Sequence, residues 1–324
     1  MTRCYITIDT EYDFGFTRRT GANSRCANFD RSIACVTPGG AVGTVYQMDR
    51  FDAHGLKAVF FVDPMPALIW GVAAIEDVVG PIVARGHDVQ LHIHTEWLEL
   101  AGTSSPVGSR TGLNIKDFTF EEQCALLTYA RNVLVAAGAP APVAFRAGNY
   151  GANDDTLRAL AEIGLAYDTS FCPGIAQSHC AISLDRAVRV PVMHQGVIEV
   201  PIGCIAGHGG TLRHAQVTAI SAAETLAALH HHRRHGIDSF TLVSHSFELL
   251  SRDRSRVNEI VRRRFERLCA ALEKAEGVAT GTYADHPPAV APTGATAGTP
   301  PFSPLRTGLR LAEQALANAL YGAR

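Results

Sequence analysis

The sequence lacks the features that would indicate a membrane, nucleic-acid-binding or secreted protein. Its 324 residues carry a net charge of −2, and without a basic excess no nucleic-acid partner is expected. The longest apolar runs, such as VAAIEDVVGPIVA, are interrupted by charges and proline, so no membrane span is predicted. A strand-like pattern starts at CYITID, which leaves no room for a secretory signal and predicts a cytoplasmic protein.

Cysteine motifs are missing as well. The eight cysteines include no CxxC pair and no zinc-ribbon spacing. In a chain of this length they are expected to be reduced, mostly buried, small hydrophobic residues. Aromatic residues make up only 7% of the chain. The segment GHDVQLHIHTEW (86–97) is therefore unusual, because it places two imidazoles, a carboxylate and an indole within six residues.

Short apolar, β-branched runs alternate with longer amphipathic segments along most of the chain. The expected strands are 4–9, 57–62, 88–93, 142–147, 165–171, 197–202 and 239–245. The expected helices are roughly 41–54, 66–84, 119–137, 153–163, 215–235 and 253–275. Strands separated by helices favour crossover connections and a parallel α/β sheet. About seven such units favour a closed or nearly closed barrel over an open sheet.

The chain divides into three parts by composition. Residues 1–285 carry the barrel pattern, 286–304 form a Pro/Gly/Ala-rich linker, and 305–324 form an amphipathic helix. One face of that helix carries Leu305, Leu309, Ala312, Leu316 and Leu320. We expect this face to dock on the barrel or on a second subunit, which would make a homo-oligomer. A membrane-surface role is less favoured, because the polar face has few basic residues.

Two segments, 12–40 and 95–118, are longer than ordinary connections and are expected to be functional loops. In a βα barrel the loops after the strand carboxyl ends build the active site. The residues at those strand ends therefore carry the functional argument.

Two strand ends offer candidate metal ligands. Asp9 and Glu11 share one face of the first strand, and His92 and His94 share one face of the third. Each pair alone also fits solvated carboxylates or hydrogen-bonded structural histidines. Together they favour a metal site, and nitrogen and oxygen ligands make zinc the expected ion.

Three further strand residues are candidates for catalysis. Arg146 emerges from an apolar run and should meet a carboxylate, for which Asp168 on the next strand is the candidate. A plain scaffold ion pair explains these two residues equally well. His245 ends the last strand and is a candidate general acid. The run HHHRRH (230–235) is interpreted as a helix surface near the negative end of the helix dipole.

The order of these motifs resembles that of the polysaccharide deacetylases, the carbohydrate esterase family 4 or nodulation-type deacetylase homology domain. TIDTE loosely matches a first motif like TFDDG, KAVFFV a strand like ATFFV, and GHDVQLH a motif like GHEIGxH. FRAGNYG looks like the RxPYG-type motif, DTLRALAEIGLAYDTS the segment that follows it, and LVSHS the late histidine strand. The resemblance covers roughly residues 4–275.

This resemblance implies a distorted (β/α)7 barrel that hydrolyses an N- or O-acetyl group on a sugar with one divalent metal. Carried over, Asp9 matches the general base, His92 the first metal histidine, Arg146 the residue that orients the base, and His245 the general acid. Two positions depart from the pattern. Thr10 aligns with the family's second aspartate, so Glu11 is expected to replace it. The second histidine of HxxxH aligns with Glu96, so His94 or Glu96 would complete a divergent site.

The expected function is therefore removal of an acetyl group from an N-acetylated sugar, with Tyr150 and Trp97 near the substrate. In a cytoplasmic protein the substrate would be a precursor in surface-polysaccharide or lipopolysaccharide assembly. Two alternatives stay open: hydrolysis of a small cyclic amide or imide on the same barrel, and a non-catalytic sugar-binding protein whose metal site has decayed.

Overall fold

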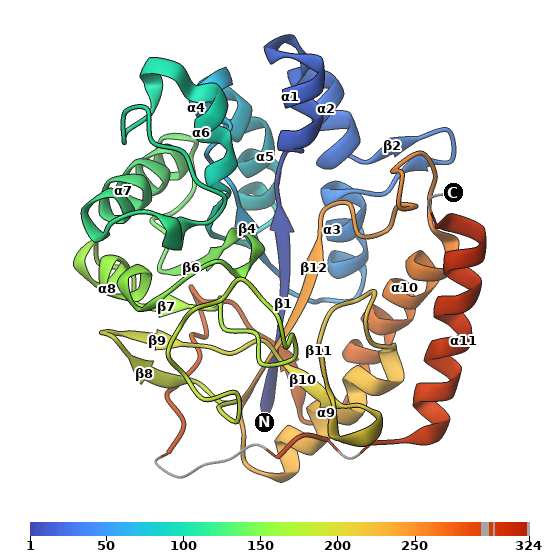
Figure 1. Cartoon of the computed structure of the whole chain (residues 1–324). Helices are drawn as coiled ribbons and strands as arrows, with labels where there is room; N and C mark the ends of the chain where they lie inside the picture. Colours follow the sequence, from blue (N-terminus) through green and yellow to red (C-terminus); the bar gives the residue numbers. More distant parts are fainter. Residues whose placement is uncertain (293–297, 301, 323–324) are drawn as a thin grey trace.

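A curled sheet of parallel strands forms the centre of the structure, and helices cover its outer face (Figure 1). The computed structural model describes residues 1–292, 298–300 and 302–322. The nine-stranded sheet has the order β12-β1-β4-β5-β6-β7-β9-β8, with β13 also paired to β1. All neighbours from β12 to β9 run parallel, and only β8 pairs antiparallel with β9. The seven strands from β12 to β9 give the distorted (β/α)7 barrel predicted from the sequence.

The large sheet and two small hairpins contain the following strands: β1 (Thr2–Thr10), β2 (Val36–Thr37), β3 (Gly40–Ala41), β4 (Val59–Val62), β5 (Asp88–Ile93), β6 (Ala144–Ala147), β7 (Tyr167–Asp168), β8 (Val192–His194), β9 (Val197–Glu199), β10 (Cys204–Ala206), β11 (Leu212–His214), β12 (Ser239–His245) and β13 (Val278–Thr280). The hairpins are β2-β3 and β10-β11.

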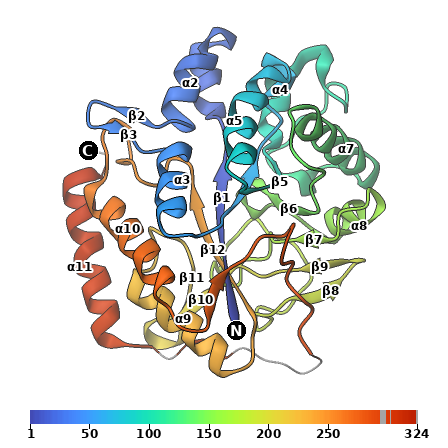
Figure 2. The ribbon, with the colours of Figure 1, turned by 180° about the vertical axis from the view of Figure 1, so that it is seen from behind.

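The helices lie outside the sheet, and Figure 2 shows the same layer from behind. The α-helices are α1 (Phe14–Thr20), α2 (Arg25–Ser32), α3 (Thr44–Ala53), α4 (Ala67–Trp70), α5 (Ala73–Ala84), α6 (Leu98–Ala101), α7 (Phe120–Ala136), α8 (Asp154–Glu162), α9 (Ala222–Arg234), α10 (Glu259–Glu273) and α11 (Pro304–Tyr321). Short 3-10 turns are η1 (Ala22–Ser24), η2 (Thr95–Trp97), η3 (Gly102–Ser104), η4 (Ile115–Asp117), η5 (Gly148–Tyr150) and η6 (His208–Gly210).

The barrel closes through the segment after β9 rather than through a full strand ladder. Ile202 forms an isolated parallel bridge to Thr241 of β12. The backbone N–H of Gly203 also donates to the Thr241 carbonyl, at 3.0 Å. A side chain at Gly203 would collide with this strand, since an added Cβ would lie 2.6 Å from the Phe240 ring.

Alternation along the strands separates the core into an interior and an exterior layer. The interior cluster contains Tyr5, Val59, Phe61, Ala144, Val200 and Tyr283, so aromatic rings fill the barrel below the site. Neighbours in register, such as Phe61 and Gln90, point to the same side. The larger cluster lies between the sheet and the helices and includes Ile6, Ile8, Phe60 and Phe145.

The predicted elements are confirmed with small shifts in their bounds. Expected strands 88–93 and 239–245 match β5 and β12 residue for residue. The capping box of Thr119 and Glu122 is present at the start of α7. The expected helix 66–84 is two helices, because Gly71 adopts a left-handed φ of 71° between α4 and α5.

Three expectations, about a loop, the start of a helix and a helix surface, are wrong. Segment 12–40, expected as a long loop, folds into α1, α2 and a small hairpin. The start of the expected helix 215–235 is irregular, and α9 begins at Ala222. Within the run 230–235, His231 and His232 are buried, contrary to the expected helix surface. His232 Nδ1 donates a hydrogen bond of 2.9 Å to the Ser239 carbonyl.

The C-terminal helix is present as α11, but it does not dock through the expected leucine face. Leu305, Leu309, Leu316 and Leu320 are exposed, whereas Arg310 is buried. Arg310 forms an ion pair of 3.1 Å with Glu224, which explains the preference for the polar face. The division into barrel, linker and helix stays a prediction, and its residues 293–297, 301 and 323–324 lie outside the described residues.

The cysteines agree with the sequence-based expectation. All eight are free, and five of them are buried. Among the described residues no helix combines the length and the apolar character needed to span a bilayer.

Candidate metal and catalytic site

The candidate residues meet at the carboxyl ends of neighbouring strands. Asp9 of β1 is in register with His245 of β12, and His92 of β5 is in register with Arg146 of β6. Side chains in register on parallel neighbours lie on the same side of the sheet. A cavity of about 230 Å³ opens there, lined by Asp9, Glu11, His92, His94, Ala147, Asn149, Tyr150, Gln216 and His245.

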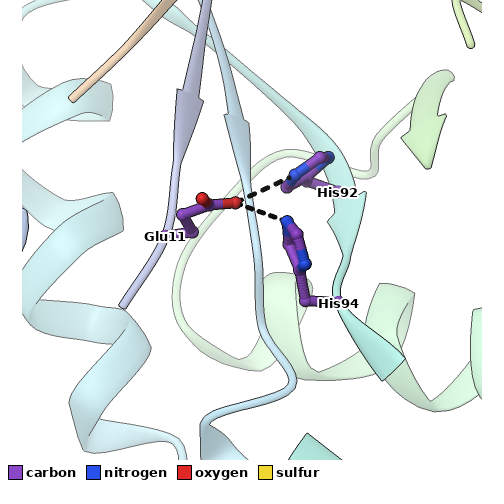
Figure 3. A group of neighbouring side chains, drawn as sticks. All are labelled: Glu11, His92 and His94. Atoms are coloured by element: carbon purple, nitrogen blue, oxygen red, sulfur yellow. Dashed lines mark hydrogen bonds and ion pairs between the residues drawn. The ribbon is translucent and has the colours of Figure 1, made fainter. Parts of the chain in front are cut away.

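Glu11, His92 and His94 form the candidate metal-binding group within this cavity (Figure 3). Their possible ligand atoms all lie within 4.8 Å of one another. The Glu11 Oε2 atom is 2.6 Å from His94 Nε2 and 3.2 Å from His92 Nε2. These are the three ligands expected from the sequence.

The other nitrogen of each imidazole is held by a neighbouring acceptor. His92 Nδ1 lies 2.8 Å from the Arg146 carbonyl, and His94 Nδ1 lies 2.7 Å from Glu96 Oε2. Metal-binding histidines typically donate their second ring N–H to a carbonyl or carboxylate in this way, which turns the free nitrogen toward the ion. The residues thus fit a divalent cation with two nitrogen ligands and one oxygen ligand. Glu96 orients His94 and is not part of the three-residue group.

The charges in this group stabilise one another. Burial alone would raise the pKa of Glu11, but His94 and His92 hold it well below its usual range. Burial would lower the pKa of His94, whereas Glu11 and Glu96 raise it well above its ordinary value. The Glu11 carboxylate is therefore ionised, and a bound cation would take the place of the proton on His94.

Asp9 is held by a buried arginine. Its Oδ1 atom accepts a hydrogen bond of 2.6 Å from Arg146 Nη1, while Arg146 is fully buried. The guanidinium carbon lies 4.4 Å from the centroid of the Phe61 ring. Arg146 Nε also donates to the Thr169 carbonyl, at 3.3 Å. This packing fixes the Asp9 carboxylate at the lining of the cavity.

The expected contact between Arg146 and Asp168 is wrong. Asp168 is in register with Phe145, one residue before Arg146, so its side chain points to the exterior layer. There it is completely buried, accepts hydrogen bonds from Ser170 and is in register with Glu199. Asp168 does not line the cavity. A direct catalytic role for this residue therefore does not fit the structure.

His245 is paired with a carboxylate that the sequence analysis missed. His245 Nδ1 lies 2.6 Å from Glu248 Oε2. Burial alone would lower the pKa of His245, but Glu248, with smaller contributions from Asp9 and Glu11, raises it to about 9. The imidazole is therefore protonated at neutral pH, as a general acid requires.

Glu248 is itself fixed by a small hydrogen-bond network. Gln216 Nε2 donates to both of its oxygens, at 2.9 and 3.1 Å, and the Thr218 hydroxyl donates to Oε1. His214 Nε2 lies 2.8 Å from Gln216 Oε1, which orients the amide. Glu248 could have been noticed in the sequence as a carboxylate three residues after His245. However, no hydrophobic periodicity predicts the turn that brings these two side chains together.

The loop after β6 forms one wall of the cavity. Asn149 and Tyr150 both have left-handed backbone conformations, with φ of 56° and 57°. Two consecutive non-glycine residues in this region are uncommon, and such strain concentrates at functional sites. Burial raises the pKa of the Tyr150 hydroxyl well above its ordinary value, so it stays protonated and can donate a hydrogen bond.

Trp97, expected near the substrate, does not reach the cavity. It is completely buried and packs edge-on against Phe14 and Trp70, with ring centroids 5.6 and 5.5 Å away. These contacts join η2 to α1 and α4. Trp97 supports the loops around the site, and the prediction that it binds substrate is wrong.

Comparison with known proteins finds similarity in three dimensions only. No protein-family model matches the sequence, and no curated protein sequence matches it. A structure from Mycobacterium smegmatis, assigned as a polysaccharide deacetylase, has a TM-score of 0.53 and 18% identity, covering 87% of this chain and 88% of that one. The chain has the polysaccharide-deacetylase fold. At this identity the similarity establishes the fold alone.

Two other solved structures are more distant. A family 4 carbohydrate esterase from Streptomyces lividans, in complex with acetate, has a TM-score of 0.43 and 12% identity, covering 93% of this chain and 98% of that one. The peptidoglycan N-acetylglucosamine deacetylase Bc1960 has a TM-score of 0.41 and 12% identity, covering 89% of each chain.

Within the polysaccharide-deacetylase fold, the two sequence departures have a structural reason. Thr10, which aligns with the family's second aspartate, is fully buried and lies on the exterior side of β1. Glu11, one residue later, returns to the interior side and reaches both histidines. Glu11, one residue after Thr10, and His94, two residues before Glu96, thus complete the Glu/His/His group with His92.

Proposed function

We propose that this protein is a metal-dependent deacetylase that hydrolyses the acetamido group of an N-acetylated sugar. The observation that carries the proposal is the pairing across β1 and β12. A carboxylate held by arginine and a protonated histidine held by glutamate face one cavity that also contains a Glu/His/His group.

Glu11, His92 and His94 would hold the cation. Two imidazoles and one carboxylate leave a fourth position open, which is the arrangement of catalytic zinc sites, so we expect zinc. A bound divalent cation supplies Lewis-acid polarisation of the acetyl carbonyl and lowers the pKa of water.

Asp9 is proposed as the general base. It lines the cavity with one oxygen engaged by Arg146, which leaves the other oxygen to accept a proton from the attacking water. Arg146 keeps the carboxylate in one orientation and stabilises its negative charge. Arg146 therefore acts as a positioning residue.

His245 is proposed as the general acid. When the carbon–nitrogen bond breaks, the departing amine is a poor leaving group unless its nitrogen receives a proton. The protonated His245 can supply that proton from Nε2, because its Nδ1 is engaged by Glu248. The products are acetate and a free amino sugar.

The tetrahedral oxyanion formed by water attack needs hydrogen-bond donors as well. Donors fixed in advance at the developing charge lower the barrier more than mobile ones do. We propose that a backbone N–H near Tyr150 contributes, because the left-handed pair of residues 149–150 brings this backbone to the cavity wall.

The proposed substrate is an N-acetylated sugar or glycan precursor, and we propose a cytoplasmic role in surface-polysaccharide or lipopolysaccharide assembly. The polysaccharide-deacetylase fold and the cavity of about 230 Å³, which has room for an acetamido group, support this class. The sugar itself is to be identified by substrate screening.

The test is acetate release by the purified protein, supplied with zinc, from a panel of N-acetylated sugars and nucleotide sugars. Asp9→Asn and His245→Ala are expected to lower kcat by roughly 10²-fold or more. Asp30→Asn and His235→Ala, at exposed positions of α2 and the end of α9, are matched controls expected to keep the wild-type rate.

Three outcomes would contradict the proposal. Near wild-type turnover in Asp9→Asn or His245→Ala would show that the substituted residue is not the general base or the general acid, respectively. Ring opening of cyclic amides or imides without acetate release would indicate the alternative hydrolase. A protein that binds no divalent metal and releases no acetate would be a non-catalytic relative.

A further inference from the structure

We propose that Arg254 and Arg31 form a subsite that binds a phosphate group of the substrate beside the proton donor. This subsite rests on the proposed deacetylase function, and it makes the substrate an N-acetylated sugar that carries a phosphate. Figure 1 shows α1 and α2 above the carboxyl end of β1. Arg31 lies on α2 and Arg254 in the segment after β12, and the two segments contact each other through these side chains.

Arg254 reaches the wall of the site that carries His245. The rings of His245 and Phe247 are stacked, with centroids 5.1 Å apart. The guanidinium carbon of Arg254 lies 3.8 Å from the centroid of the same Phe247 ring. Burial lowers the pKa of Arg254, and the charges of Asp13 and Glu11 counter this shift. Because Glu11 belongs to the candidate metal-binding group, the charge of Arg254 acts on the site itself.

The two arginines carry more positive charge than the neighbouring carboxylate balances. The Oδ2 atom of Asp13 is 3.4 Å from Arg254 Nη1 and 3.7 Å from Arg31 Nε. The other carboxylate oxygen of Asp13 accepts a hydrogen bond from the Phe16 N–H in the first turn of α1. One carboxylate thus faces two guanidinium groups, and one positive charge is left over.

Both arginines have donor groups available for a ligand. Arg254 Nη1 also donates to the Ser32 hydroxyl, at 3.1 Å. Within the described part of the chain, no hydrogen bond or ion pair engages Nε or Nη2 of Arg254. The Nε atom of Arg31 is buried and has no hydrogen-bond partner among the same residues. A buried donor without a partner costs free energy, which a bound acceptor would recover.

The backbone at Arg254 is strained. Its φ is 60°, in the left-handed region that residues with a side chain rarely adopt. Such conformations cost free energy and concentrate at functional sites. This conformation, which is independent of the charges, also favours a functional role for Arg254.

A phosphate matches this pair of arginines better than a carboxylate does. One arginine can engage both oxygens of a carboxylate, whereas a phosphate monoester has three free oxygens and up to two negative charges. Arg254 and Arg31 approach the same Asp13 oxygen, so their guanidinium groups converge and can share one phosphate. Sugar phosphates and nucleotide sugars both supply a phosphate on the sugar that bears the acetamido group.

Binding is measured first, by isothermal titration calorimetry on the zinc-free protein, so that phosphate cannot bind to the metal. We expect N-acetylglucosamine 1-phosphate to bind about tenfold or more tightly than N-acetylglucosamine. Arg254→Met should remove this difference, and Arg31→Met should reduce it. Arg252→Met is the matched control, because it removes the same charge from an exposed position of the same segment. It should keep the difference, and circular dichroism confirms that each variant is folded.

Turnover is then measured with zinc for N-acetylglucosamine, its 1-phosphate and UDP-N-acetylglucosamine. We expect kcat/KM to be higher for the phosphorylated substrates, and Arg254→Met should lower this preference by about tenfold or more, through KM rather than kcat. A preference for the 1-phosphate would identify a sugar phosphate as the source of the phosphate group. A preference for UDP-N-acetylglucosamine would identify a nucleotide sugar.

The subsite and the deacetylase function fail in different ways. Selective binding of the phosphorylated sugar without acetate release from any substrate would overturn the deacetylase function and support the subsite. Acetate release with equal kcat/KM for neutral and phosphorylated sugars, or a phosphate preference kept in Arg254→Met, would overturn the subsite alone. A stronger preference for N-acetylmuramic acid, which carries a carboxylate and no phosphate, would overturn the assignment to phosphate.

Discussion

Single side chains in this site are placed by strand register, and register is only partly visible in the sequence. The alternation of each strand predicted which residues share a face, and Asp9, Glu11, His92 and His94 meet as expected. It did not predict how neighbouring strands align. Asp168 therefore failed as the partner of Arg146, because it is in register with Phe145 instead.

The first residue-scale prediction concerns Glu248→Gln. This change removes the charge that raises the pKa of His245 to about 9. The pKa should fall by roughly one or more, because an adjacent opposite charge typically contributes a shift of about 1 to 3. A general acid works only when protonated, so activity is lost as pH rises through its pKa. The basic limb of the kcat/KM–pH profile should therefore move to lower pH.

The control for this prediction is Glu162→Gln on the exposed side of α8, which should leave the profile unchanged. A Glu248→Gln enzyme with the wild-type basic limb would show that Glu248 does not set the protonation of His245.

The second residue-scale prediction concerns the buried pair of Asp168 and Glu199. Burial and the Asp168 charge raise the pKa of Glu199 well above its ordinary value, so the folded protein keeps a proton that the unfolded chain loses above about pH 4.3. This contribution to stability is present at low pH and is lost as pH rises through the folded-state pKa.

Glu199→Gln mimics the protonated acid at every pH. Relative to wild type, its free energy of unfolding should rise with pH by up to about 1.4 kcal/mol per pH unit. Urea denaturation at several pH values between about 5 and 8 measures this difference. If the difference in free energy of unfolding between Glu199→Gln and wild type stays constant across that range, Glu199 is not protonated in the folded protein.

At the scale of elements, the sequence predicted the strands and helices that have a local hydrophobic pattern. It did not predict the elements whose positions depend on tertiary contacts. The seven strands and the capping box of α7 were visible as local patterns. The two helices within 12–40 were not, because their positions depend on contacts such as that of the Asp13 N–H with Asn28, at 2.9 Å. For α11, buried ion pairs determined which face docks.

One element-scale prediction concerns η5 and β5, which touch at Gly148. A Cβ added there would lie 2.7 Å from the Ile93 carbonyl oxygen and 2.8 Å from His94 Nδ1. Gly148→Ala should therefore displace His94 from Glu96 and weaken zinc binding by about 10-fold or more. Titration against a zinc chelator measures this affinity.

Gly80→Ala is the matched control, since a Cβ at this position of α5 meets no atom within 4 Å. It should keep the wild-type affinity. Equal zinc affinity in Gly148→Ala would mean that the close approach of η5 to His94 has no role in metal binding.

For the whole molecule, the count of strand–helix units predicted a barrel, but the way it closes had no signal in the sequence. Ile202 and Thr241 lie in the expected strands 197–202 and 239–245, but they meet in a single isolated bridge, which strand patterns do not predict. The tilted and edge-on packing of Tyr5 and Phe61 against Tyr283 inside the barrel likewise depends on which faces of distant segments meet.

The prediction at this scale links metal binding to global stability. A ligand that binds only the folded state stabilises it by about 4 kcal/mol at a concentration 1,000 times its Kd. Added zinc should therefore raise the Tm by several degrees in differential scanning calorimetry, and a chelator should reverse the shift. His94→Ala should abolish most of the shift, whereas His235→Ala should keep it. A Tm indifferent to zinc would contradict the proposed site.

Thr218 connects the last helix to the proton donor of the site. Its carbonyl accepts hydrogen bonds from Gln314 of α11 and from Arg264 of α10, while its hydroxyl donates to Glu248. A shortened protein that ends before α11 would keep every residue lining the cavity but lose one anchor of this threonine. Its measured catalytic rate would then underestimate that of a protein with α11, so functional assays call for a protein that includes this helix.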